Sequence, residues 1–129
     1  MSESNQDSEN WRLIVRSEEG NEYFINPNSI NNTNPFTVFA WYKIVPTKKS
    51  GLFDRLKELR FFGGEIAGAS YYKIYAEIDC RRSFIRILIT QAYSFDNKIL
   101  RREETLTGQW AAIPTASSFD MIREIICKQ

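Results

Sequence analysis

The chain contains two cysteines and no histidine, and these two facts constrain its fold and its chemistry more than any other feature. Cys80 closes a strand-like run, and Cys127 lies close to the C-terminus. This placement predicts a disulfide that ties the C-terminus back to a sheet and stabilises the fold by about 4 kcal/mol in the chain-entropy model. The alternative is a pair of buried free thiols in a cytosolic domain.

The composition is that of an ordinary soluble domain. The 129 residues are 43% hydrophobic and 26% charged, which predicts a single globular domain over residues 11–129 after a flexible polar tail over residues 1–10. A formal net charge of +1 argues against nucleic acid as a partner. The apolar runs fall far short of the roughly 20 residues that a membrane-spanning helix needs, so no transmembrane segment is predicted.

The compartment follows from the cysteine pair. The polar start of the given sequence shows no signal peptide pattern. Either the protein is cytosolic, or Met1 stands in place of a signal segment that export removes. A bonded cysteine pair favours export, because disulfides persist in oxidising compartments.

The hydrophobic pattern predicts strands followed by one helix. Ser117 and Ser118 are candidate N-caps for a C-terminal helix over residues 119–127. The fold class is therefore α+β, with an antiparallel sheet of about six strands and the helix packed on one face and tied to it by the disulfide. Residues 46–69 form a long connection, in which leucines between residues 52 and 59 predict a short amphipathic helix. The predicted strands cover residues 11–16, 22–25, 36–45, 70–80, 84–93 and 98–106.

Strand alternation divides the side chains between two faces. In the strand over residues 70–80, Tyr72, Ile74, Ala76 and Ile78 are expected to face the core together with Cys80. In the first strand Trp11 and Leu13 are grouped with Val15, and in the strand over residues 84–93 Ile89 is grouped with Ile85 and Ile87. The opposite face combines aromatic and charged side chains, as interfaces do, and is predicted to be an exposed binding surface. Its members are Phe39, Trp41, Lys43, Tyr71, Lys73 and Tyr75, continued by Glu77 and Asp79. The alternative is that residues 46–69 fold over this face.

Five arginines form a second candidate site. Arg81, Arg82, Arg86, Arg101 and Arg102 make a candidate basic patch, since guanidinium groups suit sulfate, phosphate and acidic surfaces. Glu103 and Glu104 follow directly, and their position favours mutual neutralisation on a solvated edge.

Catalytic chemistry has little support in this sequence. Without histidine, general base catalysis would fall to Asp, Glu or Lys, and no carboxylate cluster or nucleophile motif is present. Asp79 and Cys80 are neighbours, but alternation sends their side chains to opposite faces. Two cysteines without histidine do not make a zinc site. The sequence therefore predicts no enzyme, no catalytic residue, no metal and no cofactor.

Several motifs in order resemble the surface-adhesin protein E family of bacterial envelope proteins. They are Trp11, the segments 23–30, 38–44 and 77–80, the pieces 86–88 and 91–93, the segment 110–114, and the terminal Ile126 and Cys127. The resemblance implies a six-stranded antiparallel sheet bridged to a C-terminal helix by the cysteine pair. It also implies export, often as a lipoprotein, and for the namesake adhesin an interaction with host extracellular-matrix glycoproteins. Two departures are the lack of a lipobox cysteine and the length of the 46–69 connection.

Together these features predict an exported binding module of the periplasm, the outer-membrane surface or the extracellular space. Its partner would be a protein or glycoprotein, or a second copy of the chain in a homodimer. The alternative is a periplasmic or cytosolic assembly subunit whose exposed sheet face serves only self-association.

Overall fold

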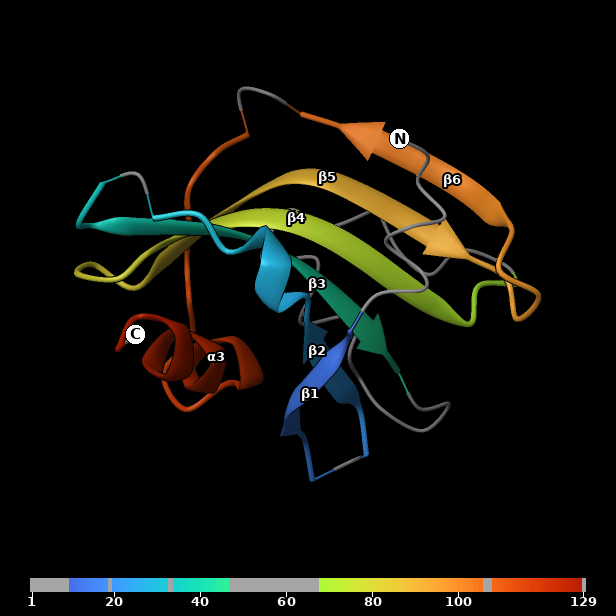
Figure 1. The fold of residues 1–129 in the computed structure, drawn as a ribbon, viewed down its shortest axis with the longest axis horizontal. Coiled ribbons are helices and arrows are strands. Elements are labelled where there is room, and N and C mark those ends of the chain that lie inside the picture. The colour runs from blue at the N-terminus through green and yellow to red at the C-terminus, as the bar shows by residue number, and fades with distance from the viewer. Residues whose placement is uncertain (1–9, 19, 33, 47–67, 106–107, 129) are drawn as a thin grey trace.

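A computed structural model describes residues 10–18, 20–32, 34–46, 68–105 and 108–128. These residues form an antiparallel sheet and a C-terminal helix (Figure 1). Six strands follow one another across the sheet in chain order, and the short strand β7 pairs with β5. The elements are β1 (Arg12–Arg16), β2 (Glu22–Ile25), the 3-10 helix η1 (Pro27–Ser29), β3 (Thr37–Val45), β4 (Tyr71–Asp79), β5 (Phe84–Tyr93), β6 (Ile99–Glu104), β7 (Ala111–Ala112) and α3 (Ser118–Ile126). The predicted sheet of about six antiparallel strands with one C-terminal helix is confirmed.

Tight turns join β1 to β2 and β5 to β6. Gly20 adopts a φ of 96° between β1 and β2, a conformation that glycine reaches without steric cost. Between β5 and β6, Asn97 has a φ of 68°, and its backbone N–H donates to the carbonyl of Ser94. Asparagine tolerates this left-handed conformation better than most residues, so the turn can close without glycine.

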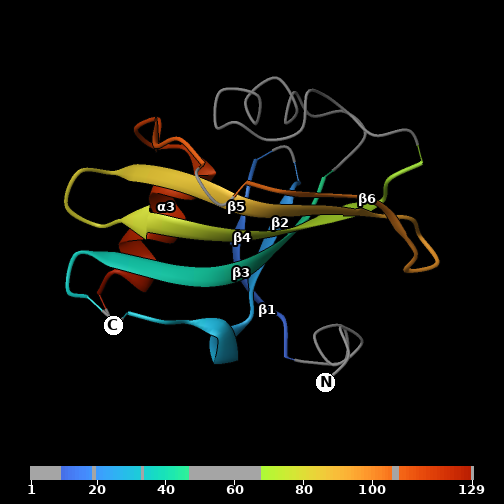
Figure 2. The ribbon, with the colours of Figure 1, turned by 90° about the horizontal axis from the view of Figure 1, so that it is seen from above.

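The core lies on one side of the sheet. Val38, Ala40, Tyr42 and Ile44 of β3 are at most 4% exposed, and their neighbours Tyr72, Ile74, Ala76 and Ile78 of β4 are at most 1% exposed. Helix α3 lies on one side of the central strands (Figure 2). Its residues Phe119, Ile122 and Ile126 belong to the same buried cluster. We call the side that carries Ile74 the core face and the side that carries Tyr75 the outer face.

Two β-bulges shift the predicted faces. In β5 the register passes from Ala76 opposite Ile87 to Tyr75 opposite Ile89, so Leu88 is an extra residue. Ile89 therefore lies on the outer face, and its grouping with Ile85 and Ile87 is wrong. An extra residue reverses the alternation beyond it, which is why one bulge moves the rest of the strand.

The same effect occurs in β1. Leu13 pairs with Phe24 and Val15 pairs with Tyr23, so the chain bulges at Ile14. Leu13 is 40% exposed and Val15 is buried, which corrects the expectation that both share a core face. The predicted helix within the 46–69 connection, and residues 1–9 of the predicted tail, lie outside the described residues.

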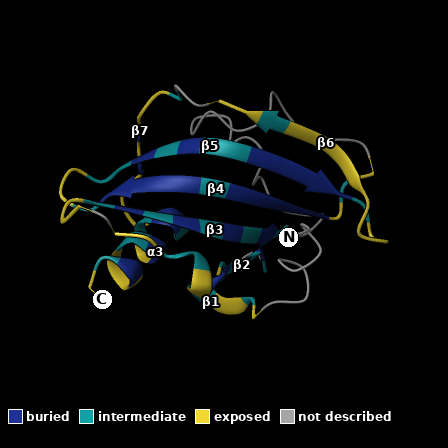
Figure 3. Cartoon of the chain, turned by 45° about the horizontal axis from the view of Figure 1, so that its top comes forward, coloured by how far each residue is buried: buried dark blue, intermediate teal, exposed yellow. Residues whose placement is uncertain are grey.

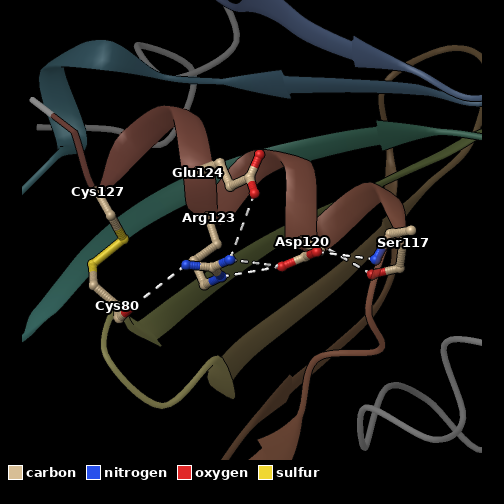
Figure 4. A network of polar contacts seen from close by, with 7 residues as sticks. Cys80, Ser117, Asp120, Arg123, Glu124 and Cys127 are labelled. Carbon is tan, nitrogen blue, oxygen red and sulfur yellow. Dashed lines mark hydrogen bonds and ion pairs between the residues drawn. A yellow bond between two sulfur atoms is a disulfide. The ribbon is translucent and has the colours of Figure 1, made fainter.

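The predicted disulfide between Cys80 and Cys127 is present and joins the β4–β5 turn to the end of α3 (Figure 4). The helix begins at its N-cap Ser117, whose hydroxyl accepts a hydrogen bond from the Asp120 backbone N–H. Asp120 in turn accepts from the Ala116 N–H at 2.9 Å and from Arg123. These two donors hold the pKa of Asp120 below its usual value. Arg123 also reaches the carbonyl oxygen of Cys80 at 3.5 Å, so both ends of the helix are fixed.

Removal of the disulfide tests how much it contributes to stability. We expect the paired change Cys80→Ala and Cys127→Ala to lower the free energy of unfolding by about 4 kcal/mol, because the bond restricts the unfolded chain. Unfolding by guanidinium chloride, with and without a reductant, measures the free energy of unfolding of both proteins. Reductant should destabilise the original protein by a similar amount and leave the paired variant unchanged. Equal stability of the two oxidised proteins would contradict this account.

Tyr42 is an unusual member of the core. Its side chain is fully buried, and its ring contacts Phe119 edge-on at a centroid distance of 6.4 Å. Among the described residues, its hydroxyl has no hydrogen-bond partner. Burial raises the pKa of Tyr42, because the phenolate would lose its hydration.

We therefore expect Tyr42→Phe to be as stable as the original protein at neutral pH, or more stable by about 1 kcal/mol. At alkaline pH the difference should grow in the same direction. The folded-state pKa of Tyr42 is raised above the unfolded-state value, which is near 10. The contribution of this residue to the free energy of unfolding is therefore fully present below that value and is lost as the pH rises above it. Phenylalanine lacks this proton linkage. Unfolding measured at pH 7 and above pH 10 checks both statements, and a clear loss of stability at neutral pH would show that the hydroxyl is satisfied.

Candidate functional site

Three aromatic side chains lie together at the centre of the outer face. Trp41 of β3 stands directly opposite Tyr75 of β4, with ring centroids 5.3 Å apart and planes tilted by 38°. Phe39, two residues earlier on the same face, stacks on Tyr75 at 6.0 Å. All three are half-buried, unlike the fully covered core residues between them. We call Phe39, Trp41 and Tyr75 the aromatic cluster.

Lys43 continues the row formed by Phe39 and Trp41 along β3. It is half-buried, and its ammonium lies 4.8 Å from the ring centre of Tyr71 and 5.6 Å from that of Phe24. These are cation–π contacts, which offset part of the cost of removing the charge from water. Burial nevertheless lowers the pKa of Lys43.

Lys73 of β4 stands directly opposite Lys43. Its ammonium lies 4.6 Å from the ring centre of Tyr93 and 5.5 Å from that of Trp11, and the residue is only 1% exposed. The ring of Tyr93 also stacks on Tyr71 at 4.9 Å. Rings from β4, β5 and the start of the chain thus surround the lysine pair.

The predicted exposure of the outer face is therefore wrong for part of its length. Tyr71, Lys73, Glu77 and Asp79 are buried, while Phe39, Trp41, Lys43 and Tyr75 remain half-buried. The cause is contact with side chains from other strands: Tyr93 and Trp11 cover Tyr71 and Lys73, and arginines pair with the two carboxylates. Figure 3 shows β4 as largely buried, whereas β6, on the far side of β5, is largely exposed. The alternative in which residues 46–69 cover the face concerns residues that lie mostly outside the described part.

A buried ion pair borders the aromatic cluster. Glu77, which is 6% exposed, accepts a hydrogen bond from the Arg86 guanidinium on β5. The guanidinium also lies 4.8 Å from the ring centre of Trp110. Because Glu77 follows Tyr75 on the same face, its charge contributes to the raised pKa of Tyr75, after burial as the larger cause.

The β4–β5 turn holds a second carboxylate in place. Asp79 accepts hydrogen bonds from the backbone N–H groups of Arg81 and Arg82, each at 3.0 Å, and from the Arg82 side chain at 3.1 Å. Burial alone would raise the pKa of Asp79, but these hydrogen bonds outweigh it and lower the pKa. Arg81 points instead over the ring of Phe36 at 4.6 Å.

The five arginines of the predicted basic patch fall into two groups. Arg81, Arg82 and Arg86 lie at or near the β4–β5 turn, whereas Arg101 and Arg102 lie on β6 opposite Ala92 and Gln91. At about 3.4 Å per residue, the two groups are roughly 17 Å apart along β5. On β6, Arg101 contacts Glu103 and Arg102 contacts Glu104 at 2.6 Å, so each charge has a neighbouring opposite charge.

Sequence reasoning missed several residues that shape this face, chiefly Trp11, Phe24 and Tyr93. The signal for Phe24 was the alternation of β2, which places it beside Lys43. Tyr93 could not be assigned from alternation without the Leu88 bulge. Trp11, which the sequence grouped with Val15, lies just before β1 and contacts Lys73 on the outer face. Within the described ranges, no group of three or more potential metal-binding side chains occurs. The same part of the chain contains no helix long and apolar enough to cross a bilayer.

The fold is thus that of an α+β domain in which an antiparallel sheet carries a half-buried aromatic cluster and a disulfide holds the C-terminal helix. The chain belongs to the surface-adhesin protein E family, whose model matches residues 11–128. This agrees with the resemblance carried by the sequence motifs.

Solved structures of protein E from Haemophilus influenzae share this fold. One is 16% identical, covers 94% of this chain and 85% of its own, and has a TM-score of 0.53. A second crystal form is 15% identical, with coverages of 92% and 87% and a TM-score of 0.56. A selenomethionine form is 17% identical, with coverages of 92% and 84% and a TM-score of 0.54. Among curated proteins, none matches this chain.

The Glu77–Arg86 pair predicts a difference between two arginines. We expect Arg86→Met to lower the free energy of unfolding by about 3 kcal/mol, because it leaves the buried Glu77 charge without its partner. The matched change Arg102→Met, on the exposed strand β6, should alter stability by less than about 1 kcal/mol. Urea unfolding of both variants provides the comparison. Equal effects would show that the Glu77–Arg86 pair is no more important than a surface ion pair.

Proposed function

We propose that this protein is a non-enzymatic, exported binding module of the bacterial envelope, acting at the cell surface as an adhesin-like protein. Membership of the surface-adhesin protein E family supports a binding role rather than a catalytic one. The Cys80–Cys127 disulfide supports export to the periplasm, the outer-membrane surface or the extracellular space, since such bonds persist in oxidising compartments. The single domain over residues 11–129 would be the binding unit.

The observation that carries the proposal is the half-buried aromatic cluster. Phe39 and Trp41 each contact the ring of Tyr75 in the middle of a sheet face, and all three keep part of their surface in contact with solvent. Aromatic side chains dominate the energetics of many interfaces, because each contributes a large rigid surface with little loss of side-chain entropy. The partner would be a host or surface glycoprotein that covers this cluster.

The sheet geometry favours the face over the edge as the binding surface. The exposed strand β6 carries two arginines followed by two glutamates, and these charges already pair with each other, Arg101 with Glu103 and Arg102 with Glu104. Charged edge strands resist pairing with other chains. The aromatic cluster, by contrast, lies on interior strands and presents its side chains outward.

Substitution of the aromatic cluster tests the proposal. We expect Trp41→Ala and Tyr75→Ala to weaken binding to immobilised extracellular-matrix glycoproteins by about 2 kcal/mol or more, because each removes a central aromatic contact. Phe95→Ala is the matched control, since Phe95 is 85% exposed in the β5–β6 turn and lies outside the cluster. Its binding should equal that of the original protein.

Each variant is first tested for folding by circular dichroism and for molecular mass by light scattering. Folded variants that bind as well as the original protein would contradict the proposal. Variants that keep glycoprotein binding but lose self-association would favour the assembly subunit instead. If both variants unfold while Phe95→Ala folds, the cluster is part of the core and its assignment as a binding surface is wrong.

A further inference from the structure

Lys43 differs from several arginines elsewhere in the structure. Arg16, Arg82 and Arg86 each lie within ion-pair distance of a carboxylate. For Lys43, the described residues place no carboxylate within that distance, and its ammonium lies over the rings of Tyr71 and Phe24. The residue is half-buried rather than fully covered, so a ligand can reach it from the outer face.

The surroundings of Lys43 disfavour its charge in two ways. Partial burial removes water from the ammonium, which is why its pKa is lowered. Lys73 stands directly opposite on β4, and like charges at opposing positions of neighbouring strands repel. An anion beside Lys43 would reduce both costs, so the site is electrostatically complementary to a negative group.

The position of Lys43 within the sheet restricts what kind of ligand can supply that group. Lys43 pairs with Phe24 of β2 on one side and with Lys73 of β4 on the other. The backbone of β3 is therefore occupied on both sides, and an extended peptide cannot add to it as a strand. Recognition at this point relies on side chains alone: one cation and the neighbouring aromatic rings.

An anionic sugar fits this combination of side chains. Trp41 lies two residues before Lys43 on the same face, about 7 Å away along the strand, and stacks with Tyr75. A pyranose ring can pack its C–H groups against an aromatic ring while an acidic substituent extends to a neighbouring lysine. We propose that Lys43, Trp41 and Tyr75 form a subsite for an anionic saccharide ring, one that carries a carboxylate or a sulfate. This inference rests on the proposed function and specifies which part of a glycoprotein the site binds.

Matched saccharides test this inference. A trisaccharide of uronic acid, its uncharged methyl ester and a sulfated form of that ester, whose only charged groups are sulfates, are each titrated into the folded protein by calorimetry. We expect at least one anionic form to bind about tenfold more tightly than the ester, which corresponds to about 1.4 kcal/mol. Comparison of the carboxylated and sulfated forms identifies the acidic group. The preference should weaken as salt is added, because the charges are partly exposed to solvent.

Two variants assign the preference to Lys43. Lys43→Met should remove the difference between the acid and the ester, and Lys43→Arg should retain it. Lys98→Met is the matched control, because Lys98 is an exposed lysine in the β5–β6 turn paired with Asp96 at 3.7 Å, and it should bind as the original protein does. If Lys43→Met does not fold, the thermal shift of the original protein with acid and with ester decides the matter.

The inference is overturned if the original protein binds no anionic trisaccharide better than the ester. A folded Lys43→Met protein that retains the full preference would overturn it as well. Either of these outcomes can be distinguished from a failure of the proposed function. A protein that binds matrix glycoproteins through Trp41 and Tyr75, with no loss in Lys43→Met, would keep the proposed function and exclude the saccharide subsite.

Discussion

The antiparallel pairing of β3 with β4 is the constraint on which the rest of the structure depends. It runs from Thr37 opposite Asp79 to Ile44 opposite Tyr72 without an interruption. Because side chains alternate along each strand, this single register directs Ala40, Tyr42 and Ile74 into the core. The same register places Trp41 against Tyr75 and Lys43 against Lys73 on the outer face. A slip of one residue would exchange the two sets.

The disulfide and the helix act on this central pair from one end. Cys80 immediately follows β4, so the bond to Cys127 fixes α3 to the end of the strand that carries the site. Phe119 of α3 contacts the rings of Tyr23 and Tyr42 edge-on. These stabilising contacts lie on the core face. The outer face can therefore carry side chains that a hydrophobic core would not accommodate, such as the opposed Lys43 and Lys73.

The sequence predicts the core face well, because both β3 and β4 alternate without a bulge along their shared ladder. It does not predict the continuation of the outer face onto β5. Ile87, Leu88 and Ile89 are all apolar, so nothing in their pattern shows which residue is extra, and the bulge at Leu88 decides where Ile89, Gln91 and Tyr93 point. The burial of Lys73 was unpredictable for a related reason. Its ring contacts come from Trp11 and Tyr93, which alternation within β4 cannot reveal.

The candidate site therefore lies where the covered part of one sheet face meets the part that is open to solvent. Towards one end, Lys73 and Tyr71 are covered by rings, and towards the other, Glu77 and Asp79 are neutralised by arginines. Between them Trp41 and Tyr75 remain half-buried, and so does Lys43, which stands directly opposite Lys73. A rigid neighbour on each side limits the motions of these three side chains, so a ligand that covers them loses little side-chain freedom. The same neighbours leave Lys43 as the half-buried charge for which the described residues provide no carboxylate. Specificity at such a site is then a matter of charge: the aromatic rings accept many flat or apolar surfaces, and Lys43 selects those that carry a negative group.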